Sequence, residues 1–159
     1  EFVLGWLLAL ERRIFDRAQA SVWDDAPELG VFGKTMGILG TGSIGSAVAK
    51  SAQHFGIRCR GLNSDGRPVN GFEACFKAGD HRFFDDLDFV VSVLPKTTHT
   101  ENAIDQEALN RLSPGSIVIN IGRCYDDASG NMSRECINAG PGALYPLKLR
   151  ANADPWDKV

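Results

Sequence analysis

The feature that most constrains this chain is a glycine-rich turn between an apolar run and an amphipathic segment. Gly40, Gly42 and Gly45 follow the apolar residues 36–39 with the spacing G-x-G-x-x-G. The order strand, turn, helix seats the pyrophosphate of a dinucleotide, because a helix start offers N–H groups and partial positive charge to an anion. After the turn, apolar side chains recur at helical spacing, at Ile44, Ala47, Val48, Ala52 and Phe55.

The rest of the pattern predicts a parallel sheet. Apolar runs at 57–62, 88–95 and 116–122 are typical of strands buried on both faces, and helices are expected at 44–55 and 105–112. Strands of this kind, separated by helices, predict an α/β fold: a Rossmann-like, doubly wound parallel sheet with helices on both faces. Residues 72–87 give no clear prediction. After Cys124 the pattern is weaker, with a helix near 132–139 and a strand near 143–147.

Composition excludes several classes of protein. The chain has 159 residues, 43% hydrophobic and 23% charged, which is typical of a globular domain. A net charge of −3 argues against a general nucleic-acid binder. The longest apolar run, 2–10, is too short to span a bilayer, and its arginines follow it, unlike those of a signal peptide. We therefore expect no membrane partner.

The four cysteines favour a reduced, cytoplasmic protein. They form no C-x-x-C pair and have no metal-ligand spacing with the three histidines, so we expect free thiols and no metal site. The residues concerned are Cys59, Cys75, Cys124 and Cys136.

The first segment, residues 2–20, reads as one helix with two apolar stripes. A helix that is apolar on more than one face packs against more than one partner, here a second domain or a second subunit. Residues 21–34 read as a loop. The stripes are Val3, Leu7, Leu10 and Ile14 on one side, and Leu4, Leu8 and Phe15 on the other.

Four pieces in register, at 33–45, 93–100, 108–115 and 119–123, resemble the NAD-binding domain of the D-isomer-specific 2-hydroxyacid dehydrogenases. The resemblance covers residues 1–124. It implies a homodimeric oxidoreductase that moves hydride between NAD or NADP and a small D-2-hydroxy or 2-keto acid. It also divides the chain into an interdomain and dimer helix (1–20), a loop (21–34), a Rossmann core (35–124) and a divergent end (125–159). The family's substrate domain is expected to lie outside this chain.

The resemblance assigns a catalytic role to Arg123, which would bind the substrate carboxylate and polarise the carbonyl. A guanidinium binds a carboxylate through two parallel hydrogen bonds, and the carboxyl end of a sheet strand faces the crevice in which ligands bind. The alternative is an arginine that caps a loop or pairs with Asp126 or Asp127. The cofactor-binding residues implied are Gly40, Gly42, Ser43, Ile44, Gly45, Asn63, Ser64, Leu94, Pro95, Thr100, Ile121, Gly122 and Arg123.

The sequence departs from the family pattern in its acid/base residues. Tyr145 stands where the family has a glutamate before Pro-Leu, and none of His54, His81 and His99 has the context of the family's catalytic histidine. We therefore expect this chain to bind cofactor without turning over a 2-keto acid. The alternative function is a non-catalytic NAD(H)-sensing or corepressor-like module. A methyltransferase on a similar sheet is disfavoured by Leu94-Pro95 and by residues 120–123.

The cofactor preference depends on the end of the second predicted strand. An acidic residue there would reject a 2′-phosphate, but the position falls on Asn63, with Ser64 and Arg67 nearby to hold a phosphate. This favours tolerance of NADP. Two alternatives stay open: Asp65 swings in to select NAD, or the loop is a solvated turn with no selective role.

Overall fold

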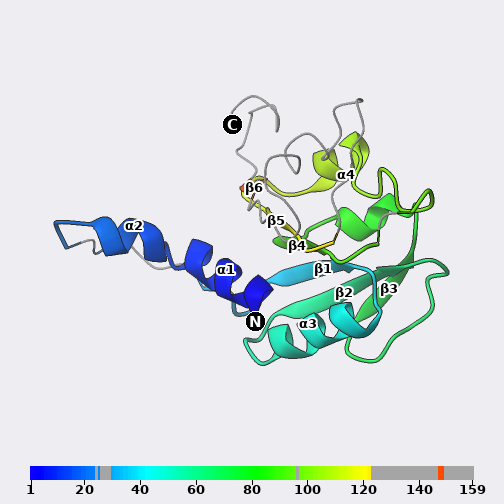
Figure 1. Ribbon diagram of the computed structural model, residues 1–159, viewed down its shortest axis with the longest axis horizontal. Coiled ribbons are helices and arrows are strands. Elements are labelled where there is room, and N and C mark those ends of the chain that lie inside the picture. Colours follow the sequence, from blue (N-terminus) through cyan, green and yellow to red (C-terminus); the bar gives the residue numbers. More distant parts are fainter. Residues whose placement is uncertain (24, 26–29, 96, 123–146, 149–159) are drawn as a thin grey trace.

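The computed structural model describes residues 1–23, 25, 30–95, 97–122 and 147–148, and its centre is a six-stranded sheet (Figure 1). The strand order is β3-β2-β1-β4-β5-β6. The first five strands are parallel, and β6 is antiparallel to β5. This confirms the predicted doubly wound α/β class. The strands are β1 (Thr35–Leu39), β2 (Arg58–Asn63), β3 (Ala74–Lys77), β4 (Phe89–Ser92), β5 (Ile117–Asn120) and β6 (Leu147–Lys148).

Helices cover both faces of the sheet, as predicted. On one face, α1 (Phe2–Glu11) and α3 (Ser43–Gln53) pack on a core that includes Met36 and Ile38. On the other face, the 3-10 helix η1 (His81–Phe84) and α4 (Gln106–Arg111) pack around Leu39, Val90 and Val118. Strand residues alternate between the two cores, because successive side chains of a strand point to opposite faces.

The central strands explain the apolar runs in the sequence. All residues of β1 and β4 are buried, and Met36 of β1 lies opposite Cys59 of β2 and Phe89 of β4. The expected strands are present with shifted ends: β1 begins one residue earlier than predicted, β2 is shifted by one residue, and β4 and β5 end three and two residues earlier. Strand ends are set by ladder hydrogen bonds, which the hydrophobic pattern does not locate.

The single helix expected over 2–20 is wrong in one respect: it is broken. Arg13 has a left-handed backbone (φ +49°), so α1 ends at Glu11 and α2 begins only at Ile14, as a separate helix (Ile14–Gln19). Figure 1 shows α1 and α2 extending away from the sheet as an arm. Val3 and Leu7 are buried, whereas Ile14 is 50% exposed, so the predicted stripe is divided at the break.

Residues 72–87, which gave no prediction, hold β3 and η1. β3 lies at one edge of the sheet and none of its four residues is buried, so it lacks the continuous apolar run of the other strands. The helix expected near 132–139 lies outside the described residues. Of the strand expected near 143–147, only Leu147 is described, and it pairs in β6. Within the described chain, every helix is too short or too polar to traverse a lipid bilayer.

Candidate functional site

The glycine turn lies where the strand order reverses, between β1 and β4. Gly40 follows β1 and Leu94 follows β4, so both stand at the carboxyl edge of the sheet. Open parallel sheets bind ligands in the crevice at this edge and at this switch point. Backbone hydrogen bonds fix the position of the turn: Gly40 N donates to Leu62 O at 2.9 Å, and Val93 N donates to Leu39 O at 3.0 Å.

The three glycines of the motif have different surroundings. Gly40 has a left-handed backbone (φ +99°), and a Cβ there would lie 2.9 Å from Val93 Cγ2. A Cβ on Gly45 would collide with the carbonyl oxygen of Gly40. A Cβ on Gly42 would meet no heavy atom within 4 Å. The turn therefore has open space beside Gly42, on the side where a pyrophosphate is expected to approach.

The start of α3 is electrostatically suited to an anion. Gly42 is its N-cap residue and makes no side-chain capping bond, and the first turn contains no acidic residue. Neither the cap residue nor the first turn of α3 therefore supplies a group that neutralises the partial positive charge of the helix N-terminus. Ser46 Oγ donates to Thr41 O at 3.0 Å, which holds the turn against the helix.

A cleft of about 700 Å³ opens beside the turn. It is large enough for a cofactor or substrate, since ligand pockets commonly enclose ~300–1,000 Å³. Its lining comes from the ends of β1, β2 and β4, from η1 and from the loop before α4. The predicted cofactor residues that line it are Gly40, Gly42, Asn63, Ser64, Leu94 and Thr100.

Asn63 holds two walls of the cleft together. Its Nδ2 donates to Thr41 Oγ1 at 3.3 Å and to Arg67 O at 2.9 Å, and its Oδ1 accepts from Gly66 N at 2.6 Å. The side chain is thus used to shape the turn over residues 63–67. Ser64 and Arg67 line the cleft beside it.

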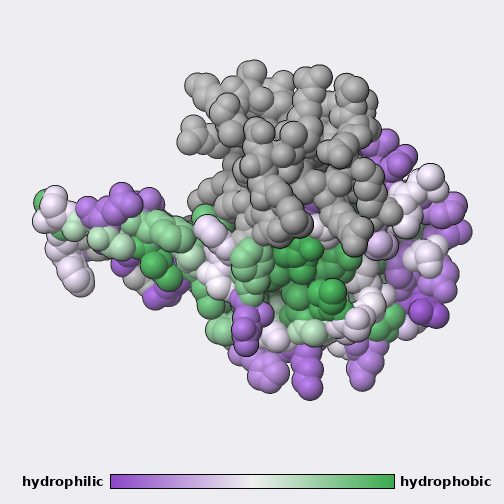
Figure 2. Space-filling view, viewed as in Figure 1, coloured by the Kyte–Doolittle hydropathy of each residue, from purple (hydrophilic) through white to green (hydrophobic). Residues whose placement is uncertain are grey.

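A second hollow, of about 370 Å³, lies between α1 and α3 and is lined mainly by apolar side chains. Figure 2 shows hydrophobic residues gathered on this face beside the base of α1. Three predicted cofactor residues, Ser43, Ile44 and Ile121, line this hollow and not the first cleft. Ile44 is 60% exposed although it is apolar.

The remaining predicted residues have other positions. Gly45 is buried under the turn, Pro95 is exposed, and Thr100 Oγ1 donates to Pro95 O at 2.6 Å. Gly122 N donates to Asn120 Oδ1 at 2.9 Å, at the carboxyl end of β5. Arg123, the predicted substrate-binding residue, lies outside the described residues, so its role stays a prediction.

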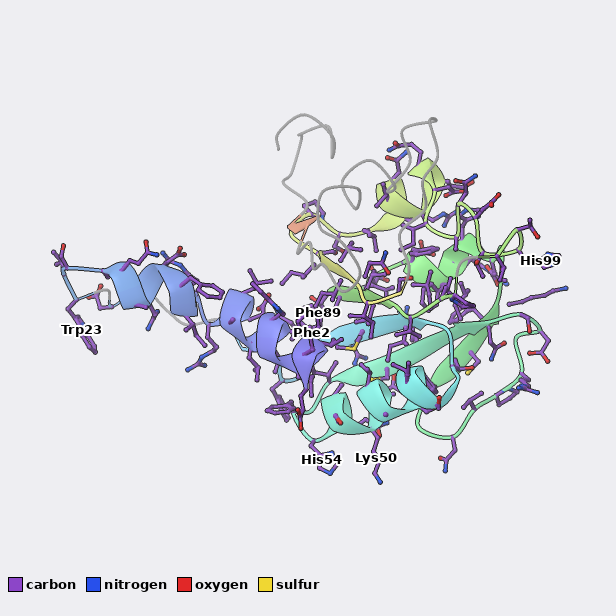
Figure 3. All side chains as sticks on the ribbon, viewed as in Figure 1. Phe2, Trp23, Lys50, His54, Phe89 and His99 are labelled. Carbon is purple, nitrogen blue, oxygen red and sulfur yellow. The ribbon has the colours of Figure 1, made fainter. Side chains whose placement is uncertain are left out.

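The three histidines are separated in space. His54, at the end of α3, points away from the body, and its Nδ1 lies 2.8 Å from Lys50 O (Figure 3). His99 is exposed at the cleft rim. His81 lies in the cleft wall and contacts Asp105. The described residues contain no group of three potential metal ligands, and Cys59 and Cys75 are both free thiols.

Several cleft residues were not assigned to the site from the sequence. Among them, Phe84, His81 and Asp105 come from η1 and from the start of α4, and Thr41 is a variable residue of the glycine motif. Asp105 caps α4, because its carboxylate accepts from Ala108 N at 2.8 Å. Its contact with His81 joins residues 24 positions apart, and no spacing rule predicts it.

The fold and the site together define a Rossmann-like dinucleotide-binding domain. A family model described as "D-isomer specific 2-hydroxyacid dehydrogenase, NAD binding domain" matches residues 4–125. The chain belongs to this family, and the matched part is its NAD-binding domain.

Similar proteins agree with this assignment. The chain is 39% identical over 133 residues to glyoxylate/hydroxypyruvate reductase B of Pectobacterium carotovorum, with 76% of this chain and 41% of the relative covered. A D-isomer specific 2-hydroxyacid dehydrogenase family protein from Aeromonas salmonicida superposes with a TM-score of 0.73 at 32% identity, covering 83% of this chain and 44% of that one. A D-isomer specific 2-hydroxyacid dehydrogenase from Xanthobacter autotrophicus, solved in complex with NADPH, superposes with a TM-score of 0.68 at 30% identity. The match covers 77% of this chain and 40% of that one. The chain thus spans about two fifths of the length of these three relatives.

Proposed function

We propose that this chain binds NAD or NADP across the glycine turn and serves a D-2-hydroxyacid dehydrogenase that interconverts a small 2-keto acid and its 2-hydroxy acid. The observation that carries the proposal is the open space beside Gly42 at the uncapped start of α3. When bound, the nicotinamide supplies the hydride chemistry. The protein contributes the anion site, the orientation of the two halves of the cofactor and the shape of the cleft.

The substrate class rests on Arg123 and on the relatives. The guanidinium of Arg123, which follows β5 in the sequence, would bind the carboxylate of a 2-keto acid at the carboxyl edge of the sheet. The Pectobacterium relative is a glyoxylate/hydroxypyruvate reductase, which makes glyoxylate and hydroxypyruvate the first substrates to test. The resemblance gives the catalytic acid/base to a glutamate–histidine pair that has no counterpart in this sequence, since Tyr145 stands at the glutamate position.

We further propose that the site accepts NADP. Asn63 carries no charge to reject a 2′-phosphate, and Ser64 and Arg67 line the cleft next to it. The Xanthobacter relative binds NADPH. Titration with NADH and NADPH tests this, and a preference for NAD of about a hundredfold or more, about 2.7 kcal/mol, would contradict it.

We propose a homodimer formed through the arm. Ile14 and Phe15 are half exposed on α2, and Trp23 is 89% exposed beyond it (Figure 3). Exposed apolar side chains on a projecting element are typical of an interaction site. Light scattering of the unaltered protein should give twice the mass of one chain, and light scattering of Phe15→Asp should give the mass of a single chain.

We also propose that the protein lies in the cytoplasm, where the thiols of Cys59 and Cys75 stay free. Fractionation of cells tests this location.

The test of the reaction is an assay with reduced cofactor and glyoxylate, hydroxypyruvate or pyruvate. This chain alone should give no loss of nicotinamide absorbance above background, because general acid–base help is worth roughly 10²–10⁴-fold. A chimera that adds the substrate domain of the Pectobacterium relative and replaces residues 125–159 with the corresponding segment of that relative should turn over the acid, and Arg123→Ala in it should abolish that turnover. Tight cofactor binding without turnover in the joined protein would favour the alternative, a non-catalytic NAD(H)-sensing module.

A further inference from the structure

The ion pair between His81 and Asp105 lies in the cleft wall, and neither the sequence pattern nor the comparisons give it a role. His81 Nε2 lies 3.1 Å from both carboxylate oxygens of Asp105. His81 belongs to η1, whereas Asp105 is the N-cap of α4 and accepts from Ala108 N. One pair therefore joins two elements that line the same cleft.

The pair belongs to the adenosine side of the cleft. The end of β2, at Asn63, is where a dinucleotide-binding fold meets the adenosine ribose. Leu62 and Phe84 line the cleft on this side but are only 5% and 3% exposed, whereas the side chain of His81 is 28% exposed. The ring of His81 packs against that of Phe84, with centroids 6.4 Å apart and an angle of 37° between the planes. Movement of His81 would therefore move part of the surface offered to the base.

We infer that His81 and Asp105 are a positioning pair for the adenosine half of the dinucleotide, holding η1 and the start of α4 together as one wall of its site. This inference rests on the proposed function, because it assumes that a dinucleotide occupies the cleft. The pair acts on the ligand through the position of the wall, and neither residue takes part in hydride transfer.

The charges around His81 make Asp105 its main partner. Glu107 Oε2 lies 3.9 Å from His81 Nδ1, but Glu107 also binds Arg111 at 3.3 Å. Asp80, the preceding residue, binds Arg82 at 2.7 Å, and Arg111 also binds Asp85 at 3.1 Å. Since both other nearby carboxylates already have arginine partners, Asp105 is the main side-chain partner of His81.

Asp105 is suited to remain ionised. Burial acts to raise the pKa of Asp105, but hydrogen bonds from the amide of Ala108 and from His81 outweigh burial and lower it. The carboxylate therefore remains an acceptor for His81 as well as for Ala108 N. If the bonds between His81 and Asp105 are lost, η1 and the start of α4 are joined more weakly, and affinity for the adenosine half should fall.

The experiment measures binding of ADP-ribose, the adenosine half, and of nicotinamide mononucleotide, the other half, at one fixed pH. His81→Ala, which removes the hydrogen bonds to Asp105, should bind ADP-ribose roughly two- to fivefold more weakly than the unaltered chain. His81→Gln, whose amide can still donate to Asp105, should recover part of this loss. Nicotinamide mononucleotide should bind all three proteins equally.

Two further variants sharpen the test. His54→Ala, on the exposed end of α3, should bind ADP-ribose as the unaltered chain does. Asp105→Asn keeps an oxygen for Ala108 N but weakens the acceptor for His81, so it should also lower the affinity for ADP-ribose. Unchanged ADP-ribose affinity in both His81→Ala and Asp105→Asn, or equal weakening of both half-ligands, would overturn the positioning role. If the unaltered chain binds no ADP-ribose, the proposed function fails and this inference falls with it.

Discussion

Gly45 packs so closely against Gly40 that a Cβ on Gly45 would collide with the Gly40 carbonyl oxygen. By contrast, a Cβ on Gly42 would meet nothing within 4 Å, and its backbone (φ −72°) is one that any residue adopts. Within one motif, the fold itself requires Gly45 and leaves Gly42 unconstrained. Any requirement for glycine at position 42 must therefore come from a bound ligand and not from the packing of the described residues.

Alanine substitutions should separate these two requirements. Gly45→Ala should lower the free energy of unfolding by about 1–3 kcal/mol, because overpacking forces α3 away from β1. Gly42→Ala should cost less than about 1 kcal/mol, the difference between glycine and alanine at an N-cap. Denaturant unfolding of both variants measures this. Equal losses would show that the turn is packed differently from the structure described.

A partly buried ion pair attaches the arm to the sheet. Lys34 Nζ donates to Glu11 Oε2 at 2.5 Å, the side chains of Lys34 and Glu11 are 24% and 5% exposed, and the ammonium lies 5.2 Å from the centroid of the Phe89 ring. Glu11→Leu should destabilise the protein by about 1–2 kcal/mol, because it removes the charged hydrogen-bond partner of Lys34. The double variant Glu11→Leu, Lys34→Met should recover most of that loss in thermal and denaturant unfolding. A double variant as unstable as the single one would contradict a paired role.

Asn63→Asp should shift the cofactor ratio towards NAD by roughly tenfold, because a carboxylate repels the 2′-phosphate of NADP. It should also cost about 1 kcal/mol of stability, since aspartate cannot donate to Thr41 Oγ1 and Arg67 O as Asn63 Nδ2 does. Asn110→Asp, the same change on the exposed side of α4, is the matched control for both measurements. An unchanged ratio of NADH to NADPH affinity in Asn63→Asp would place the adenosine ribose elsewhere.

The Cys59 thiol should be unreactive in the folded protein. Burial, with a smaller effect from Glu73, raises its pKa to about 11, so at pH 8 only about one molecule in a thousand carries the reactive thiolate. Alkylation at pH 8, mapped by mass spectrometry, should leave Cys59 unmodified and modify the half-buried Cys75. Both should react after denaturation. Rapid modification of Cys59 in the native state would mean that β2 opens easily.

The sequence predicts the centre of this fold better than its edges. β1, β4 and β5 are continuous apolar runs because both of their faces are covered, and such runs are visible in any single sequence. β3 is an edge strand with no buried residue, so it leaves no such signal. The break at Arg13 depends on a positive φ in a residue that carries no turn signature.

The candidate site divides in the same way. The glycines and Asn63 were found because local chemistry at a turn fixes their types. His81 and Asp105 were not assigned to the cleft because they meet only through tertiary packing of η1 on α4. Asn63 also shows what a motif leaves out: its side chain shapes the 63–67 turn through three hydrogen bonds that no spacing rule predicts.

The most direct test of the central claim is a calorimetric titration of the unaltered chain and of Gly42→Val with NADH and NADPH. The open space beside Gly42 admits the valine side chain without a clash in the free protein, so thermal unfolding should change little. In the cleft, that side chain would occupy the expected position of the pyrophosphate, and affinity should fall at least about tenfold, or 1.4 kcal/mol. If Gly42→Val binds both cofactors as tightly as the unaltered chain does, the dinucleotide does not sit on this turn.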